Sequence, residues 1–205
     1  MKTIMGPVFL LCMACVVVSA QPARRMQAGV TVQYDHYNFT DSNSGISATD
    51  DRGNVAFGVF LDAIYLRAAV QYQRTLSGTL AVSGYGSAAY PSGFSISFVN
   101  FQVLAKYPFA LGSVTFWPAV GMRYSHPLTM QIGGVDYLSD PNIDVADLYV
   151  SFGGGLDFSS GSTIIGIFAL YDYSLTPSQT KNPLYPGEQV SGYDLEIGVS
   201  LGFAL

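Results

Sequence analysis

Apolar and polar residues alternate with a period of two along the last stretch of the chain. One face of 193–205 carries Leu195, Ile197, Val199, Leu201, Phe203 and Leu205, and the other carries Asp194, Glu196, Gly198, Ser200 and Gly202. Successive side chains of a β-strand point to opposite faces, so this pattern predicts a strand with one apolar and one polar face. Seven earlier segments alternate similarly and are predicted strands: 27–37, 54–61, 64–73, 99–107, 113–124, 147–158 and 163–173.

The connections between these segments are alternately short and long. We predict tight turns at Asp62-Ala63, Pro108–Gly112 and Ser159–Ser162, and long loops at Asn38–Gly53, Thr75–Gly93, Ser125–Ala146 and Ser174–Gly192. Outer-membrane barrels have an even number of antiparallel strands, short periplasmic turns and long external loops. The sequence therefore predicts an all-β fold, an eight-stranded antiparallel transmembrane β-barrel. In 163–173 both faces are apolar, and Asp172 indicates that the odd-numbered residues face outward.

Aromatic residues of the apolar faces gather at the two ends of the predicted strands. We assign eight of them to the membrane interfaces: Tyr34, Tyr72, Tyr124 and Tyr173 before the long loops, and Tyr107, Phe116, Phe158 and Phe203 at the other rim. Such paired aromatic girdles are typical of membrane barrels. The alternative is a soluble, lipocalin-like barrel with its apolar face inside. Charged residues make up only 11% of the chain, against roughly 25% in soluble proteins, which favours the membrane barrel.

The N-terminus resembles a secretory signal. Lys2 is followed by an uncharged apolar run and by Val18-Ser19-Ala20, so we predict a cleaved signal peptide at 1–20 and a barrel domain at 21–205. Cleavage before Cys15, as in a lipoprotein, is the alternative. Cleavage after Ala20 removes Lys2 and changes the net charge of the chain from −5 to −6. A negative chain is a poor binder of nucleic acid. The predicted location is the outer membrane, with membrane lipid and the insertion machinery as partners.

One hairpin of the predicted barrel resembles a known family. The segment 104–109 ends a strand with Tyr107 and Phe109, and Pro118, Gly121 and Tyr124 follow with characteristic spacing. In these features the chain resembles the OmpW-like and related small outer-membrane β-barrel proteins. The resemblance implies an eight-stranded barrel that acts as a channel for small solutes. The chain departs from that family in ending on Leu205 and in having a charged inward face.

The inward face carries charges of both signs. They form the predicted lumen charge network: Asp35, Arg67, Lys106, Arg123, Asp157, Asp172, Asp194 and Glu196. An eight-stranded barrel has an interior just wide enough to be filled by side chains, and buried charges need partners. The same residues could therefore form a paired plug or line an ion-conducting path.

Other chemistry has weaker support in the sequence. A lipid-modifying enzyme would need a hydroxyl, an imidazole and a carboxylate in mutual reach. The chain has His36 beside Asp35, and Ser125 next to His126. Because Ser125 is adjacent to His126 in the sequence and not across from it, we expect no catalytic residues and no enzyme. Acidic loop residues lack the spacing of a calcium-binding loop, so neither a metal nor a cofactor is expected. These residues are Asp41, Asp50, Asp51, Asp136, Asp140, Asp144 and Asp147.

Two functions remain open at this point. The resemblance implies a narrow channel for small solutes. The charged lumen and long loops favour a surface-exposed protein, acting in adhesion or envelope integrity through host or surface ligands at its loops.

Overall fold

The structure is a computed structural model that describes residues 26–43, 46–82, 86–89, 94–132, 135–136, 138, 147–175 and 190–205. Its wall consists of long strands: β1 (Gln27–Asn43), β2 (Ile46–Ala63), β3 (Leu66–Val82), β5 (Ser95–Lys106), β7 (Val114–Ile132), β9 (Asp147–Ser160), β10 (Thr163–Ser174) and β11 (Val190–Ala204). Three short strands lie at the ends of the wall: β4 (Gly86–Ala89), β6 (Phe109–Leu111) and β8 (Val135–Asp136). The predicted signal peptide, 1–20, lies outside the described residues.

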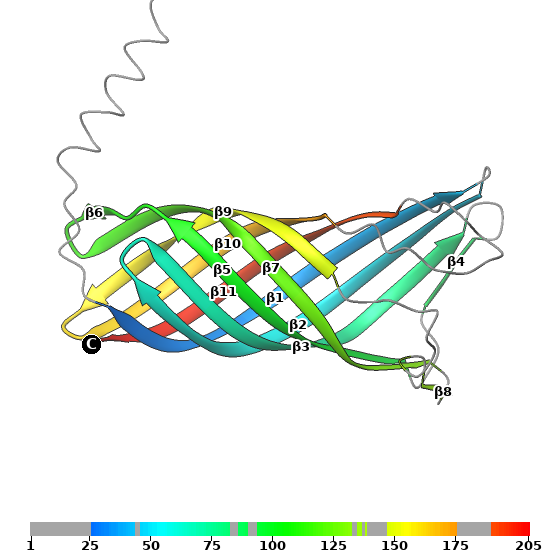
Figure 1. Ribbon diagram of the computed structural model, residues 1–205, viewed down its shortest axis with the longest axis horizontal. Coiled ribbons are helices and arrows are strands. Elements are labelled where there is room, and N and C mark those ends of the chain that lie inside the picture. The colour runs from blue at the N-terminus through cyan, green and yellow to red at the C-terminus, as the bar shows by residue number, and fades with distance from the viewer. Residues whose placement is uncertain are drawn as a thin grey trace, which may run out of the picture.

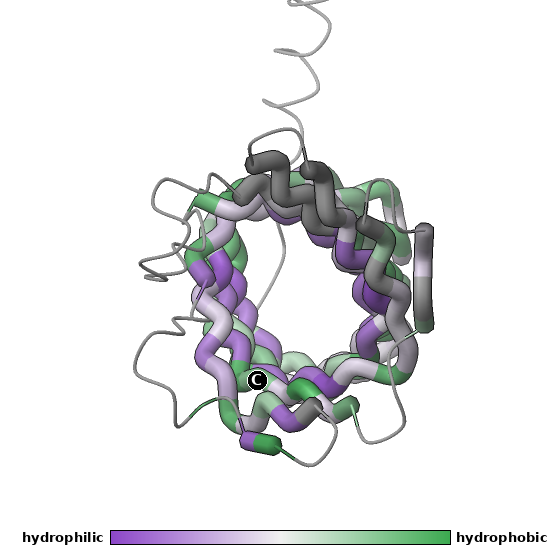
Figure 2. The backbone as a smooth tube through the Cα atoms, turned by 90° about the vertical axis from the view of Figure 1, so that its right-hand side faces the viewer, coloured by the Kyte–Doolittle hydropathy of each residue, from purple (hydrophilic) through white to green (hydrophobic). Residues whose placement is uncertain are grey.

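The long strands close into a barrel. Each pairs antiparallel with its neighbours, and β1 pairs with β2 on one side and with the last strand, β11, on the other. Gln27, for example, lies opposite both Asp62 and Ala204. Viewed along its axis, the wall is a complete ring (Figure 2). The predicted eight-stranded antiparallel barrel is thus confirmed. Among the described residues, no helix is long and apolar enough to cross a membrane.

The two faces of the wall are sorted as the alternation predicts. Outward residues such as Val59, Val199 and Ile167 are 45–59% exposed, whereas inward Glu196 is fully buried. In β10, Ile165 and Tyr173 are exposed while Ile164 and Asp172 are buried, so the odd-numbered residues do face outward. A lipocalin-like barrel would have the opposite arrangement. The exposed apolar band therefore suits lipid, and the polar set fills the lumen.

Aromatic rings cover the outer face near both rims. At the end with the short turns (Figure 1), the ring of Tyr107 lies 5.8 Å from that of Tyr65 and 4.9 Å from that of Phe109. At the other end, Tyr171 stacks on Tyr193 at 5.5 Å. Of the eight aromatics assigned to the interfaces, six are exposed; Tyr72 and Tyr107 are partly exposed.

The strand ends differ from the prediction at the short turns. The expected turn at Asp62-Ala63 is wrong, because both residues belong to β2 and the turn is formed by Ile64 and Tyr65. Ile64 has a φ of 51°, the positive value that two-residue hairpin turns use. In 108–112, residues 109–111 form β6 against the start of β7, so the turn moves to 112–113.

The long connections are also shorter than predicted. The expected loop at Asn38–Gly53 is largely a hairpin, since β1 runs to Asn43, β2 begins at Ile46, and only 44–45 separate them. β3 and β7 likewise continue to Val82 and Ile132. The strands β1, β2, β3 and β7 have 17 to 19 residues, whereas a tilted strand crosses a bilayer in about 9 to 11. Parts of the predicted loops 75–93, 125–146 and 174–192 lie outside the described residues.

A charge placed in the middle of the outer wall should destabilise the barrel. Val199 lies midway along β11 and is 53% exposed, so Val199→Arg should lower the free energy of unfolding by about 2–4 kcal/mol in lipid. Leu205→Arg, directly after the end of β11 and therefore at the rim of the barrel, should lower the free energy of unfolding by only about 0–1 kcal/mol. Urea titration of protein folded into lipid vesicles measures both. Equal losses at the two positions would contradict the lipid-facing assignment.

Candidate functional site in the barrel lumen

The structure places all eight predicted network residues inside the barrel. Each of them is buried, with at most 5% of its surface exposed. They separate into two groups. The outer cluster, nearer the long connections, consists of Asp35, Arg123, Asp172, Asp194 and Glu196. The inner cluster, nearer the short turns, consists of Arg67, Lys106 and Asp157, together with Asp62, a residue predicted to lie in a turn.

Arg123 is the centre of the outer cluster. Its Nη2 donates to Asp194 at 2.7 Å, and its Nη1 lies 2.9 Å from Asp172 and also donates to Glu196. Its guanidinium carbon lies 4.4 Å from the centre of the Tyr149 ring. One guanidinium on β7 therefore joins carboxylates from β10 and β11, which lie two and three strands away around the ring.

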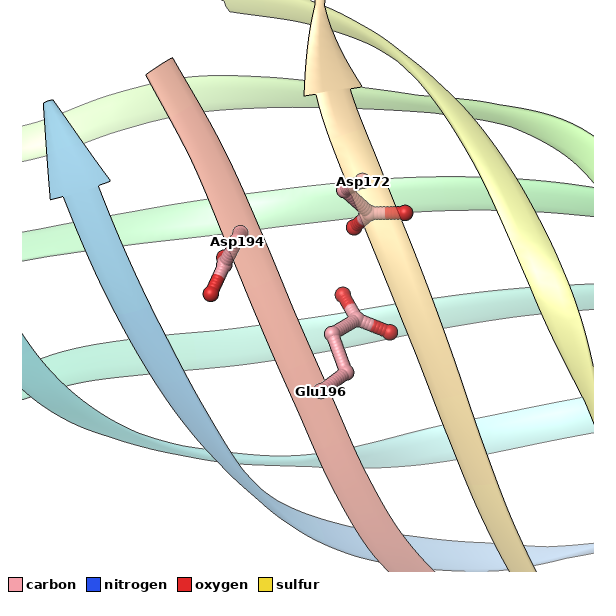
Figure 3. Close-up of side chains that lie close together, drawn as sticks. All are labelled: Asp172, Asp194 and Glu196. Atoms are coloured by element: carbon pink, nitrogen blue, oxygen red, sulfur yellow. The ribbon is translucent and has the colours of Figure 1, made fainter.

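Strand register explains why the carboxylates meet. Asp172 of β10 lies directly opposite Asp194 of β11, and Asp35 of β1 lies opposite Glu196. Residues opposite each other on one face have Cβ atoms roughly 5 Å apart. Figure 3 shows Asp194 and Glu196 on one strand and Asp172 on the next, with the Glu196 carboxyl group reaching towards Asp172. Gln102 donates to Glu196 at 3.1 Å, and Gln33 to Asp35 at 3.0 Å.

The inner cluster joins charges to aromatic rings. Lys106 pairs with Asp62, which also accepts a hydrogen bond from Gln27 at 2.8 Å. The Arg67 guanidinium lies 4.1 Å from the ring centre of Phe60, and the Lys106 ammonium 5.2 Å from that of Trp117. Two cations face two carboxylates here, Asp62 and Asp157, so this layer is electrically balanced. Neither side chain of the Lys106–Asp62 pair is more than 2% exposed.

Large rings occupy the lumen where the neighbouring strand carries glycine. Trp117 lies opposite Gly155, and a Cβ on Gly155 would stand 2.5 Å from the indole ring. Phe168 occupies the equivalent place over Gly198 of β11. With Leu104, Ala119 and Leu170, these rings form a buried apolar cluster inside the barrel. The inward glycines thus provide the space in which the lumen is filled.

A small polar cavity lies on the outer side of Arg123. It has a volume of about 30 Å³, and its lining includes Arg123, Asp147, Tyr149 and Asp194. A space of this size holds a water molecule or a single ion. Tyr149 donates to Asp147 across it at 3.0 Å.

No protein-family model matches the sequence, and neither does any curated protein. Solved structures of similar architecture include Neisserial surface protein A, with 17% identity and a TM-score of 0.45 over 87% of this chain and 99% of that one. The protein resembles small outer-membrane barrels. OprG of Pseudomonas aeruginosa has 12% identity and a TM-score of 0.45, covering 89% of this chain and 98% of its own. Ail, the attachment invasion locus protein of Yersinia pestis, has 12% identity and a TM-score of 0.40, with coverage of 87% and 99%. Sequence identities and TM-scores this low carry no information about activity. The barrel architecture is established by the strand pairing itself.

The residues considered for catalysis are not brought together. Ser125 is buried in the lumen, whereas the neighbouring His126 is exposed on the outer face and stacks on Tyr124. His36 lies 3.7 Å from Asp51, and both side chains are at least 40% exposed. Among the acidic residues of the connections, Asp50 pairs with Arg52 at 2.9 Å and Asp136 is exposed. Asp140 and Asp144, and the side chain of Asp41, lie outside the described part of the structure.

Several lumen residues were missing from the predicted network, and among them are Asp62, Gln102, Trp117 and Tyr149. These four are at most 3% exposed. For Asp62 the sequence held a usable signal, because it continues the inward series of Ala56, Gly58 and Phe60. The contacts of the other three depend on residues far along the chain, which periodicity does not reveal.

Proposed function

We propose that the protein is an exported outer-membrane barrel with a closed lumen, which acts at the cell surface through the strands that extend beyond the bilayer. The filled lumen is the observation that carries this proposal. Trp117, Arg123 and Glu196 are each at most 1% exposed. A channel would instead need a continuous wet path between such side chains. Outer-membrane lipid would surround the apolar band, and the insertion machinery would deliver the chain.

The extended hairpin of β1 and β2 is the best candidate for the acting surface. Beyond Tyr34, the two strands remain paired up to Asn43 and Ile46. Pairing also continues on both flanks, to Val190 of β11 and Val82 of β3. The extension is therefore a sheet with a defined shape, and a surface of that kind suits contact with a macromolecule.

Conductance in planar bilayers tests the closed lumen. The purified wild-type protein should show no steady ionic current, because the outer and inner clusters both obstruct the path. Steady wild-type current would overturn the closed lumen and favour the small-solute channel that the OmpW-like resemblance implies.

Surface labelling tests the topology on which the proposal rests. An epitope inserted between residues 44 and 45 should be labelled on intact cells, while one at Ile64-Tyr65 should be labelled only after the outer membrane is permeabilised. Labelling of both on intact cells would contradict the assigned orientation.

Shortening the hairpin tests whether the activity depends on the extension or on the barrel. Replacement of residues 39–50 by a two-residue turn removes paired residues beyond the bilayer and leaves both lumen clusters intact. Cells that carry this variant should then show the same attachment or envelope defect as cells lacking the protein. Full complementation by a folded, shortened protein would place the activity elsewhere.

A further inference from the structure

The outer cluster carries more negative charge than its cation can balance. Asp35, Asp172, Asp194 and Glu196 are all 0% exposed, and Arg123 is the cation that pairs with the last three of them. With every group ionised, this layer has a net charge of about −3, whereas the inner cluster is balanced. Arg52, the next cation outward, is engaged by Asp50 and stacks on Tyr37. Asp147, which lines the adjacent cavity, adds a further negative charge.

Several oxygens of this layer have no hydrogen-bond partner. They include Asp172 Oδ1, Asp194 Oδ1 and Asp35 Oδ2. The Ser151 hydroxyl is also without a partner; its residue is 0% exposed and lies directly opposite Asp172 on the inner face. Buried polar groups are usually hydrogen-bonded, so a cluster of unpartnered oxygens needs an explanation.

The geometry suits a metal ion. Asp172, Asp194 and Glu196 each offer one carboxylate oxygen, and these atoms lie within 4.8 Å of one another. Figure 3 shows the three carboxyl groups projecting into the same part of the lumen from adjacent strands. The cavity of about 30 Å³ that borders Asp194 provides space for an ion or its bound water.

We propose that the outer cluster binds a hard divalent cation, Ca²⁺ or Mg²⁺. The oxygens that Arg123 leaves free on Asp172 and Asp194, with Ser151, would supply its ligands. Carboxylate and hydroxyl oxygens are the donors that such cations prefer. Two positive charges would reduce the excess in this layer from about −3 to about −1. This inference needs the barrel and its register, and it is independent of whether the protein acts through its surface extension.

Terbium luminescence tests the site directly. The full chain is folded in a zwitterionic detergent free of lipopolysaccharide, so that no lipid phosphate competes for the ion. Excitation of tyrosine should produce saturable Tb³⁺ emission, since Tyr149 lines the cavity beside Asp194. Added Ca²⁺ or Mg²⁺ should displace Tb³⁺ and, without Tb³⁺, raise the melting temperature of the wild type.

Matched variants locate the ion. Asp172→Asn and Ser151→Ala should each weaken Ca²⁺ competition roughly tenfold or more, because affinity depends on ligand charge and number. Asp157→Asn, which removes a buried carboxylate from the inner cluster, should leave the competition unchanged. Ser151→Ala alters no charge, so it remains informative if Asp172→Asn does not fold.

Other outcomes overturn the site. Absence of saturable emission, or emission that neither Ca²⁺ nor Mg²⁺ displaces, would exclude a divalent-cation site in this layer. Loss of emission in Asp136→Asn, with no change in Ser151→Ala, would place the ion at an exposed connection instead. The cation site is tested by terbium emission, whereas the closed lumen is tested by conductance in bilayers. Either proposal can therefore fail without the other.

Discussion

Replacing Arg123 with methionine should lower the free energy of unfolding by about 3–5 kcal/mol, one of the two largest effects expected of a single lumen substitution. Methionine keeps much of the length of the side chain but removes its charge and donors. Three carboxylates that Arg123 contacts would lose their buried partner. Removal of one member of a buried ion pair costs more than the pair itself contributes, because the remaining charges stay buried.

Unfolding in urea, with EDTA present, measures this loss without compensation by a bound cation. Arg123→Lys is the matched variant: it keeps the charge but not the fork that donates to Asp194 and Glu196 together, so it should retain part of the stability. Arg74→Met, at an exposed position of β3, serves as the control and should change stability little. A loss of less than about 1 kcal/mol in Arg123→Met would mean that the carboxylates do not depend on this guanidinium.

Trp117→Ala should lower the free energy of unfolding by about 3–5 kcal/mol, because it removes the largest buried side chain and leaves a cavity. The loss also withdraws the aromatic ring that lies 5.2 Å from the Lys106 ammonium. Relaxation cannot easily fill the space, since the neighbouring Gly155 contributes no side chain.

Phe116→Ala provides the comparison, because Phe116 precedes Trp117 on β7 but lies on the outer face with 43% of its surface exposed. Lipid can fill the space left there, so the loss should be clearly smaller than at Trp117. Both are measured by urea titration in vesicles. Equal losses would mean that Trp117 packs no better than a lipid-facing ring, and the lumen would then be less tightly filled than its burial indicates.

Alternation in the sequence predicts the barrel wall well because the physical contrast that produces it is strong. A residue such as Val199 faces hydrocarbon while Ser200 faces the polar lumen, and a shift of one residue would reverse both. The same reasoning explains the error at Asn38–Gly53. Where the strands leave the bilayer, both faces meet water, so the backbone can stay paired without any alternation of side chains.

The contacts of the lumen were beyond the reach of the sequence for a different reason. Arg123 meets Asp194 and Glu196, which lie 71 and 73 residues further along the chain. Which inward residues share a level depends on the tilt and register of all the strands between them. Periodicity gives the inward set, but the division into a balanced inner cluster and an acidic outer cluster follows only from the closed ring.

The seam between β1 and β11 sets a condition on assembly. Its register begins with Gln27 opposite Ala204, so the ring cannot close until β11 has been synthesised. Before that moment the first and last strands are open edges, with backbone amides and carbonyls that find no partner in hydrocarbon. A chain shortened by its final strand would keep both edges. Such a product should aggregate or be degraded rather than persist as a seven-stranded intermediate.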